Sequence, residues 1–156
     1  RTVNGDYEFV IVWASEAGIN RDITITQADI KNLMRSKAAI YAGIRCMLNA
    51  IGMGMEDIER IYVAGAFGSY LNVRRAVEIG LLPDLPRERF VVLGNSSVKG
   101  ARLALLSQQA WDEAHALASR MTYLELSVEP SFMNEFISAN FLPHTNLELF
   151  PSVQQT

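Results

Sequence analysis

The sequence predicts an α/β domain built on a mixed sheet, and three observations lead to this prediction. An apolar run of strand length, 7–14, is followed by alternating Ile and Thr residues at 22–26. A long segment with apolar residues at helical spacing comes next. Beyond Gly54, short apolar strands alternate with helices, which indicates parallel strands joined by right-handed crossovers.

The first two strands form a hairpin, because Gly18 and Asn20 supply turn residues between them. The long helix then begins at a capping box, in which Thr26 and Asp29 each satisfy a free backbone N–H group. Its apolar residues recur three and four positions apart, and Gly52 marks its end.

The rest of the chain continues the alternation. We expect strands at 60–64, 90–93 and 123–126, and helices at about 72–79, 96–107, 109–119 and 131–140. The last residues contain Pro143 and Pro151 and predict an irregular tail. The 156 residues are thus expected to form one domain, with a core at 7–107, a C-terminal α/β extension at 108–141 and the tail at 142–156. The missing initiator methionine suggests a C-terminal fragment of a longer multidomain chain.

Composition excludes several functions. With 49% hydrophobic residues, 20% charged residues and a net charge of −3, the chain is predicted to be a cytoplasmic globular protein that binds neither nucleic acid nor membrane. A single cysteine, Cys46, can form neither an internal disulfide nor an iron–sulfur cluster within this segment. His115 and His144 have no metal-ligand spacing, so we predict no metal site and expect both on the solvated surface.

The most informative motif is the run from Ile61 to Tyr70, in which an apolar strand enters a glycine-bracketed turn and then a helix. Glycine allows a positive φ and a close approach of backbone to ligand, so Gly65 and Gly68 fit a nucleotide site. They also fit a turn that needs glycine for geometry alone, and both interpretations stay open.

A second turn supports the interpretation of the first as part of a ligand site. Asn95 and Ser96 follow the next strand, and ligands of parallel α/β sheets bind at the carboxyl ends of the strands. These two residues are equally good helix caps. Lys37 is a further candidate because it interrupts an alanine-rich stretch of the long helix, although a lysine there also fits a surface position.

Several separated blocks closely resemble one family. The residues 29–44, 61–68, 79–83 and 94–95 agree in order and spacing with the C-terminal ATPase domain of reductive activators of corrinoid proteins, and the similarity continues through 123–126 to Phe150 and Pro151. That family is part of the superfamily of acetate and sugar kinases, heat-shock chaperones and actin. The resemblance implies a ribonuclease-H-like mixed sheet with flanking helices, as the second half of an actin-like ATPase domain.

The resemblance also implies site residues. The turn at 63–68 is similar to the adenosine motif, so Gly65, Ala66 and Gly68, with their neighbours Phe67 and Ser69, are expected against the nucleoside, near Asn95 and Ser96. Lys37 is similar to a chaperone lysine that flanks adenine and ribose. Here that match is partial, because Met34 and Ala38 replace the acidic residue and the arginine of the chaperone motif.

The implied activity is an ATP-dependent return of oxidised corrinoid cobalt to its low-valent state in methyltransferase systems. Magnesium and ATP phosphates would be held by residues upstream of this segment, and the iron–sulfur cluster by a separate N-terminal domain. The implied partners are a corrinoid protein and a second copy of the chain. The segment alone is expected to be inactive, and we assign no catalytic residue.

Two other interpretations remain. One is another ATPase of the superfamily, such as an activator of acyl-CoA dehydratases, although that group carries cluster-binding cysteines that Cys46 alone cannot provide. The other is a docking or dimerisation module that binds no nucleotide. The aromatic residues that could form its surface, or equally the core, are Phe132, Phe136, Phe141 and Phe150.

Overall fold

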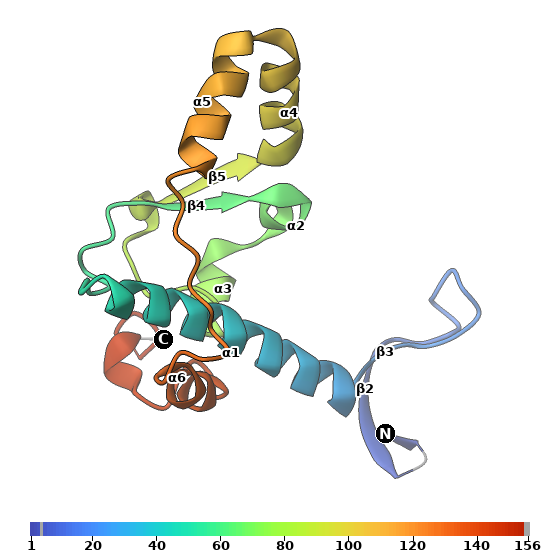
Figure 1. Cartoon of the computed structure of the whole chain (residues 1–156). Helices are drawn as coiled ribbons and strands as arrows, with labels where there is room; N and C mark the ends of the chain where they lie inside the picture. The colour runs from blue at the N-terminus through green and yellow to red at the C-terminus, as the bar shows by residue number, and fades with distance from the viewer. Residues whose placement is uncertain (4, 155–156) are drawn as a thin grey trace.

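A long helix runs from the N-terminal sheet to the packed centre of the molecule. The computed structural model describes residues 1–3 and 5–154. Helix α1, Gln27–Ala50, has 24 residues, and the antiparallel sheet lies at its N-terminal end while α6 packs along it (Figure 1). The predicted capping box is present, since the Asp29 amide donates to Thr26 Oγ1 at 3.1 Å and the Thr26 amide donates to the Asp29 carboxylate at 2.9 Å.

A three-stranded antiparallel sheet precedes this helix. Strand β2, Asp6–Val12, lies between β1, Thr2–Val3, and β3, Ile23–Thr26. The predicted hairpin is therefore confirmed, with Phe9 paired to Ile25. The sheet stands at the N-terminal end of α1, away from the other strands (Figure 1).

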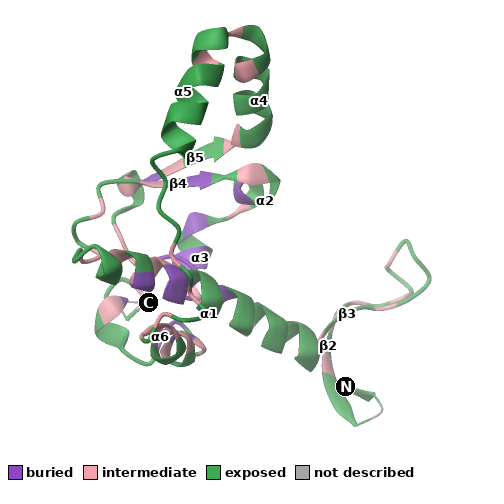
Figure 2. Ribbon diagram, in the orientation of Figure 1, coloured by how far each residue is buried: buried purple, intermediate pink, exposed green. Residues whose placement is uncertain are grey.

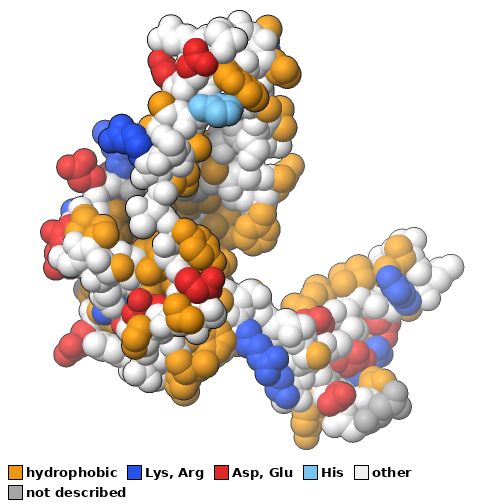
Figure 3. All heavy atoms as spheres, in the orientation of Figure 1, with side chains coloured by type: hydrophobic (Ala, Val, Ile, Leu, Met, Phe, Trp, Pro, Cys, Tyr) orange, Lys and Arg blue, Asp and Glu red, His pale blue; other side chains and the backbone are white. Residues whose placement is uncertain are grey.

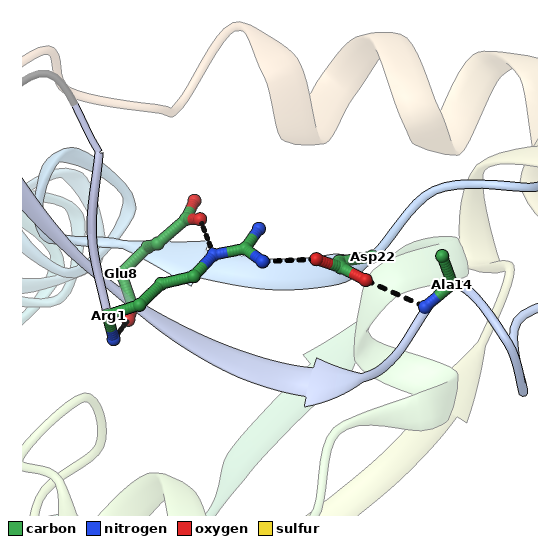
Figure 4. Close-up of polar contacts among 4 residues, drawn as sticks. All are labelled: Arg1, Glu8, Ala14 and Asp22. Carbon is green, nitrogen blue, oxygen red and sulfur yellow. Dashed lines mark hydrogen bonds and ion pairs between the residues drawn. The ribbon is translucent and has the colours of Figure 1, made fainter.

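Polar contacts to the carboxylate of Asp22 close the hairpin loop (Figure 4). Asp22 accepts a hydrogen bond from the Ala14 amide at 2.7 Å and forms an ion pair with Arg1, which also pairs with Glu8. The Ala14 amide and the Arg1 guanidinium hold the pKa of Asp22 below its usual value. These contacts tie together the two ends of the loop.

The second sheet follows α1 and is parallel. Strand β4, Ile61–Ala64, pairs with β5, Phe90–Gly94. Between them lie α2, Gly65–Tyr70, α3, Val73–Glu78, and the short 3₁₀ helix η1, Arg87–Arg89. The described strands thus form two separate sheets rather than one, and α1 lies between the hairpin and β4 in the chain.

The C-terminal part is helical. The helices α4, Ser96–Leu106, and α5, Gln108–Ala118, form a hairpin, and α6, Phe132–Ala139, packs against α1. The prediction of a strand at 123–126 was wrong. Glu125 bonds to the Tyr123 hydroxyl at 2.6 Å and to the Ser127 amide at 3.1 Å, so the chain folds back on itself. Leu126 instead packs against Gly43 of α1.

The core lies where α1 meets α3, β4 and the C-terminal segment (Figure 2). Its fully buried members include Ala38, Tyr41, Ala139 and Phe150. The segment expected as an irregular tail contains one 3₁₀ helix, η2, Leu147–Leu149, and contributes Phe150 to this core. The tail is therefore part of the packing and not an appendage.

The remaining aromatic residues of this region divide between core and surface. Phe136 packs against the core, and its ring lies 6.0 Å from that of the half-buried Phe132. Phe141 is exposed. Hydrophobic side chains also spread over the visible surface of the hairpin arm and the helices (Figure 3).

Candidate functional site

The backbone conformation of the turn after β4 requires a glycine at its first position. Helix α2 begins at Gly65 directly after the strand, and Gly65 has a φ of +93°, a region that favours glycine. A Cβ atom built on Gly65 would meet no atom within 4 Å. The backbone at Gly65 therefore borders open space, as a ligand-binding turn requires.

The second glycine of the turn has a different reason. Gly68 is buried, and a Cβ atom there would approach Cγ1 of Val63 to 3.0 Å. Gly68 thus lets α2 lie close against β4, which is a packing role. The other predicted residues of the turn, Ala66, Phe67 and Ser69, are exposed.

The turns after β4 and β5 meet, as the sequence predicts. Ala64 pairs with Gly94 at the ends of the two parallel strands. Gly94 has a φ of +70°, and a Cβ atom there would lie 3.8 Å from both Ser69 Oγ and Lys99 Nζ. A hydroxyl from α2 and an ammonium from α4 therefore lie beside the same glycine backbone.

Lys99 belongs to this cluster, although the sequence patterns above did not single it out. Its ammonium donates to the Leu93 carbonyl at 2.7 Å, which holds it over the end of β5. A signal was available, because Lys99 lies in the first turn of α4, where the helix dipole disfavours a positive charge. A lysine at such a position indicates that an anion or a carbonyl is needed to balance it.

The other two predicted residues of this turn are placed at the start of α4. The Asn95 side chain accepts from the Val98 amide at 3.1 Å and so caps the helix. Ser96 is the first residue of the helix and is half-buried. Both lie at the meeting point of the turns, and the cap accounts for Asn95 without a ligand.

Lys37 makes its hydrogen bonds to the backbone of the C-terminal segment. Its side chain is fully buried, and its ammonium donates to the carbonyl of Phe141 and, at 2.7 Å, to that of Pro143. Burial lowers the pKa of Lys37 to about 8. The lysine therefore ties α1 to the segment after α6, and its predicted role in nucleotide binding stays a prediction.

One of the two histidines is not where composition predicted. His115 is exposed on α5, but His144 is buried beside Tyr41, with ring centroids 5.4 Å apart. His144 Nδ1 accepts from the Asn146 amide at 3.0 Å, and Nε2 has no hydrogen-bond partner in the described part of the chain. Desolvation lowers the pKa of His144, so the neutral ring is favoured.

Two kinds of feature are absent from the residues that the structure describes. Among residues 1–3 and 5–154, no group of three or more His, Cys, Asp or Glu side chains could hold a metal ion. None of the helices in that part of the chain is both long and apolar enough to cross a bilayer.

Known proteins resemble the chain over most of its length. It is 37% identical over 134 residues to the corrinoid activation enzyme RamQ of Eubacterium limosum, covering 86% of this chain and 23% of the relative. It is 27% identical over 117 residues to a reductase of Methanosarcina barkeri, named for the Co(II) methylated amine-specific corrinoid protein, covering 74% of this chain and 22% of the relative.

A solved structure of a reductive activator for a corrinoid, iron–sulfur protein matches with a TM-score of 0.88 and 57% identity. The match covers 94% of this chain and 23% of that one, so the chain spans less than a quarter of the length of the proteins it resembles. A family profile described as the C-terminal domain of RACo, the ASKHA domain, matches residues 1–154. The predicted actin-like α/β fold class is thus confirmed, and the chain belongs to the family of C-terminal ASKHA domains of RACo.

Proposed function

We propose that this chain forms the adenosine side of the nucleotide site in an ATP-dependent reductive activator of corrinoid proteins. The observation that carries the proposal is the meeting of two positive-φ glycine turns, at Gly65 and Gly94, beside the Lys99 ammonium. Glycine backbone permits close approach of a nucleoside, and the Lys99 ammonium can donate a hydrogen bond to its polar atoms. The names of the matched proteins supply the corrinoid substrate.

The residues at the meeting point fit such a ligand. Gly65 borders open space, the Ser69 hydroxyl donates to the Gly65 carbonyl, and the Lys99 ammonium donates to the Leu93 carbonyl. Both polar groups can donate to a ligand as well, because an ammonium has three protons and a hydroxyl can rotate. The exposed Ala66 and Phe67 and the half-buried Ser96 complete the proposed site. Gly68 and Asn95 position the two turns, and Lys37 is proposed as a structural anchor.

The nucleotide site would be completed by other parts of the protein. ATP with magnesium would supply free energy for reduction of the cobalt, provided that the nucleotide binds two conformations of the protein with different affinity. Phosphate and magnesium ligands would come from residues outside this chain, and the iron–sulfur cluster from a separate domain. That cluster would supply the one electron that reduces Co(II) to Co(I).

The proposal includes two partners. The full-length protein is proposed to bind an oxidised corrinoid protein and to form a homodimer. Its cytoplasmic location stays a prediction from composition.

The direct test of activity uses the full-length protein. It is mixed with a Co(II) corrinoid protein and a low-potential reductant, and the cobalt absorbance is followed with and without magnesium-ATP. The proposal predicts that the Co(I) spectrum appears only with ATP. Equal reduction in its absence would contradict the ATP-dependent activity.

A pair of variants tests the site itself. Lys99→Met in the full-length protein is expected to weaken ATP binding about tenfold, because a charged hydrogen-bond donor is lost. Lys31→Met removes an exposed lysine of α1 and serves as the control. Calorimetric titration measures both, and equal affinities in the two variants would show that the nucleotide does not use Lys99.

The interpretation as a docking module keeps one supporting observation. Apolar residues of β2 are widely exposed, with Tyr7 at 70% and Phe9 at 71%. Such a face is typical of an interface. A protein that fails to bind ATP yet still forms the complex with the corrinoid protein would favour this second function.

A further inference from the structure

A cavity of about 560 Å³ lies at the end of the parallel sheet remote from the proposed nucleotide site. It is half open to solvent and is lined by helix α3, the loop before η1, the first residues of η1 and β5, and the C-terminal segment. Its volume falls within the range of small-molecule sites. Its apolar walls are Val73, Val77, Leu85, Pro86, Phe90 and Pro151.

The cavity and the proposed nucleotide site lie at opposite ends of one strand. Phe90 is the first residue of β5 and lines the cavity, whereas Gly94 is the last and lies at the meeting turns. The two positions are four steps apart along the strand, which corresponds to about 13 Å. The cavity is therefore a distinct site, and a ligand in it does not depend on the proposed function.

The acidic groups of the rim are already satisfied. Glu78 pairs with Arg74 at 2.9 Å and with Arg75 at 2.6 Å, and these arginines keep the pKa of Glu78 below its usual value. Asp84 accepts two hydrogen bonds of 2.7 Å, from the amide and the hydroxyl of Ser152. Both carboxylates therefore have hydrogen-bond donors, although only Glu78 is paired with basic side chains in the described part of the chain.

One basic group of the rim is not balanced in this way. Arg87 is exposed at the rim, makes a long bond of 3.4 Å to the Phe90 carbonyl, and in the described part of the chain pairs with no carboxylate. A guanidinium beside apolar walls can bind a carboxylate that carries a hydrocarbon body.

We propose that this cavity binds a small amphipathic carboxylate, such as a medium-chain fatty acid. The apolar body lies against Val73, Val77 and Phe90, and the carboxylate accepts hydrogen bonds from Arg87. Burial of the hydrocarbon provides the affinity, and the charged contact distinguishes the acid from a neutral compound of the same shape.

The test uses octanoate and its neutral counterpart octanamide on the full-length protein. Equilibrium dialysis measures the affinity of each, and NMR of the valine methyl groups locates the binding. We expect octanoate to bind five- to tenfold more tightly than octanamide and to shift the methyl signals of Val73 and Val77 saturably. Equal affinities, or shifts that never saturate, would overturn the proposal.

Two variants sharpen the assignment. Arg87→Gln should remove the preference for octanoate, whereas Arg102→Gln, at an exposed position of α4, should keep it. A preference that survives Arg87→Gln would overturn the role of this arginine. The comparison of the two ligands on the unaltered protein needs no variant, so it decides the matter even where Arg87→Gln fails to fold.

Discussion

A single glycine shows how closely the C-terminal segment is packed. Gly80 follows α3 with a φ of +73°, and its amide donates to the Val77 carbonyl at 2.8 Å. A Cβ atom at Gly80 would collide with the carbonyl oxygen of Pro143. The tail can pass this point only because the position has no side chain.

Gly80→Ala is therefore expected to lower the free energy of unfolding by about 3 kcal/mol, from strained backbone and overlap with Pro143. Gly100→Ala is the matched control. Gly100 lies inside α4, and no atom lies within 4 Å of the place that a methyl group would take, so alanine should stabilise the protein by about 0.5–1 kcal/mol. Urea unfolding measures both, and equal effects would contradict the close packing of Pro143.

Lys37 gives a pH-dependent prediction. Burial lowers its pKa from 10.5 to about 8, so between these values the unfolded chain holds a proton that the folded chain has lost. The free energy of unfolding should therefore rise with pH across this window, by about 2 kcal/mol from pH 8 to pH 10. Above pH 10 Tyr41, whose pKa burial raises to about 12, acts in the opposite direction.

The measurement is urea unfolding at a series of pH values for the unaltered protein and for Lys37→Met. The variant should lack the rise between pH 8 and pH 10. Identical slopes in the two proteins would show that Lys37 is not buried as the structure places it.

Some residue assignments could be made from the sequence and others could not. The turns at Gly65 and Gly94 were predictable because strand ends and glycines are local signals. The burial of Lys37 and His144 was not, since it depends on residues such as Phe141 and Phe150, which are far from α1 along the chain.

The secondary-structure elements also divide into those that local sequence signals predict and those that depend on distant contacts. Helix α1 was predicted almost to the residue, because its capping box and apolar spacing are local. The segment 123–126 was predicted as a strand and has none, because Leu126 packs against α1 and no described strand lies beside the segment to pair with it. Alternation marks one buried face and does not supply a partner.

The hairpin of α4 and α5 makes few packing contacts with the rest of the described chain. It projects beyond the parallel sheet (Figure 1), and neither helix contains a buried residue. Because few of its contacts are buried, local opening of the hairpin costs little free energy. We expect amides at 99–106 and 111–118 to exchange with deuterium at least about 100-fold faster than those at 40–46 of α1.

Hydrogen exchange followed by mass spectrometry measures this difference. The buried half of α1, which holds Ala38, Tyr41 and Cys46, serves as the internal reference. Equal protection of the two regions in the full-length protein would mean that another part of the protein covers the hairpin.

The molecule as a whole has one packed centre and two projecting parts. The antiparallel sheet lies at one end of α1 and the α4–α5 hairpin beyond β5, and both expose apolar side chains (Figures 1 and 3). The proposed nucleotide site lies at the base of the helical hairpin, where β5 enters α4. A ligand there would contact the packed centre and the projecting hairpin together.

The most direct test is the hydrogen-exchange footprint of magnesium-ATP on the full-length protein. The two turns should be protected together, at 65–69 and at 94–99, because they meet beside Gly94 and Lys99. Protection confined to other parts of the protein, with both turns unchanged, would contradict the assignment of this chain as the adenosine side of the site.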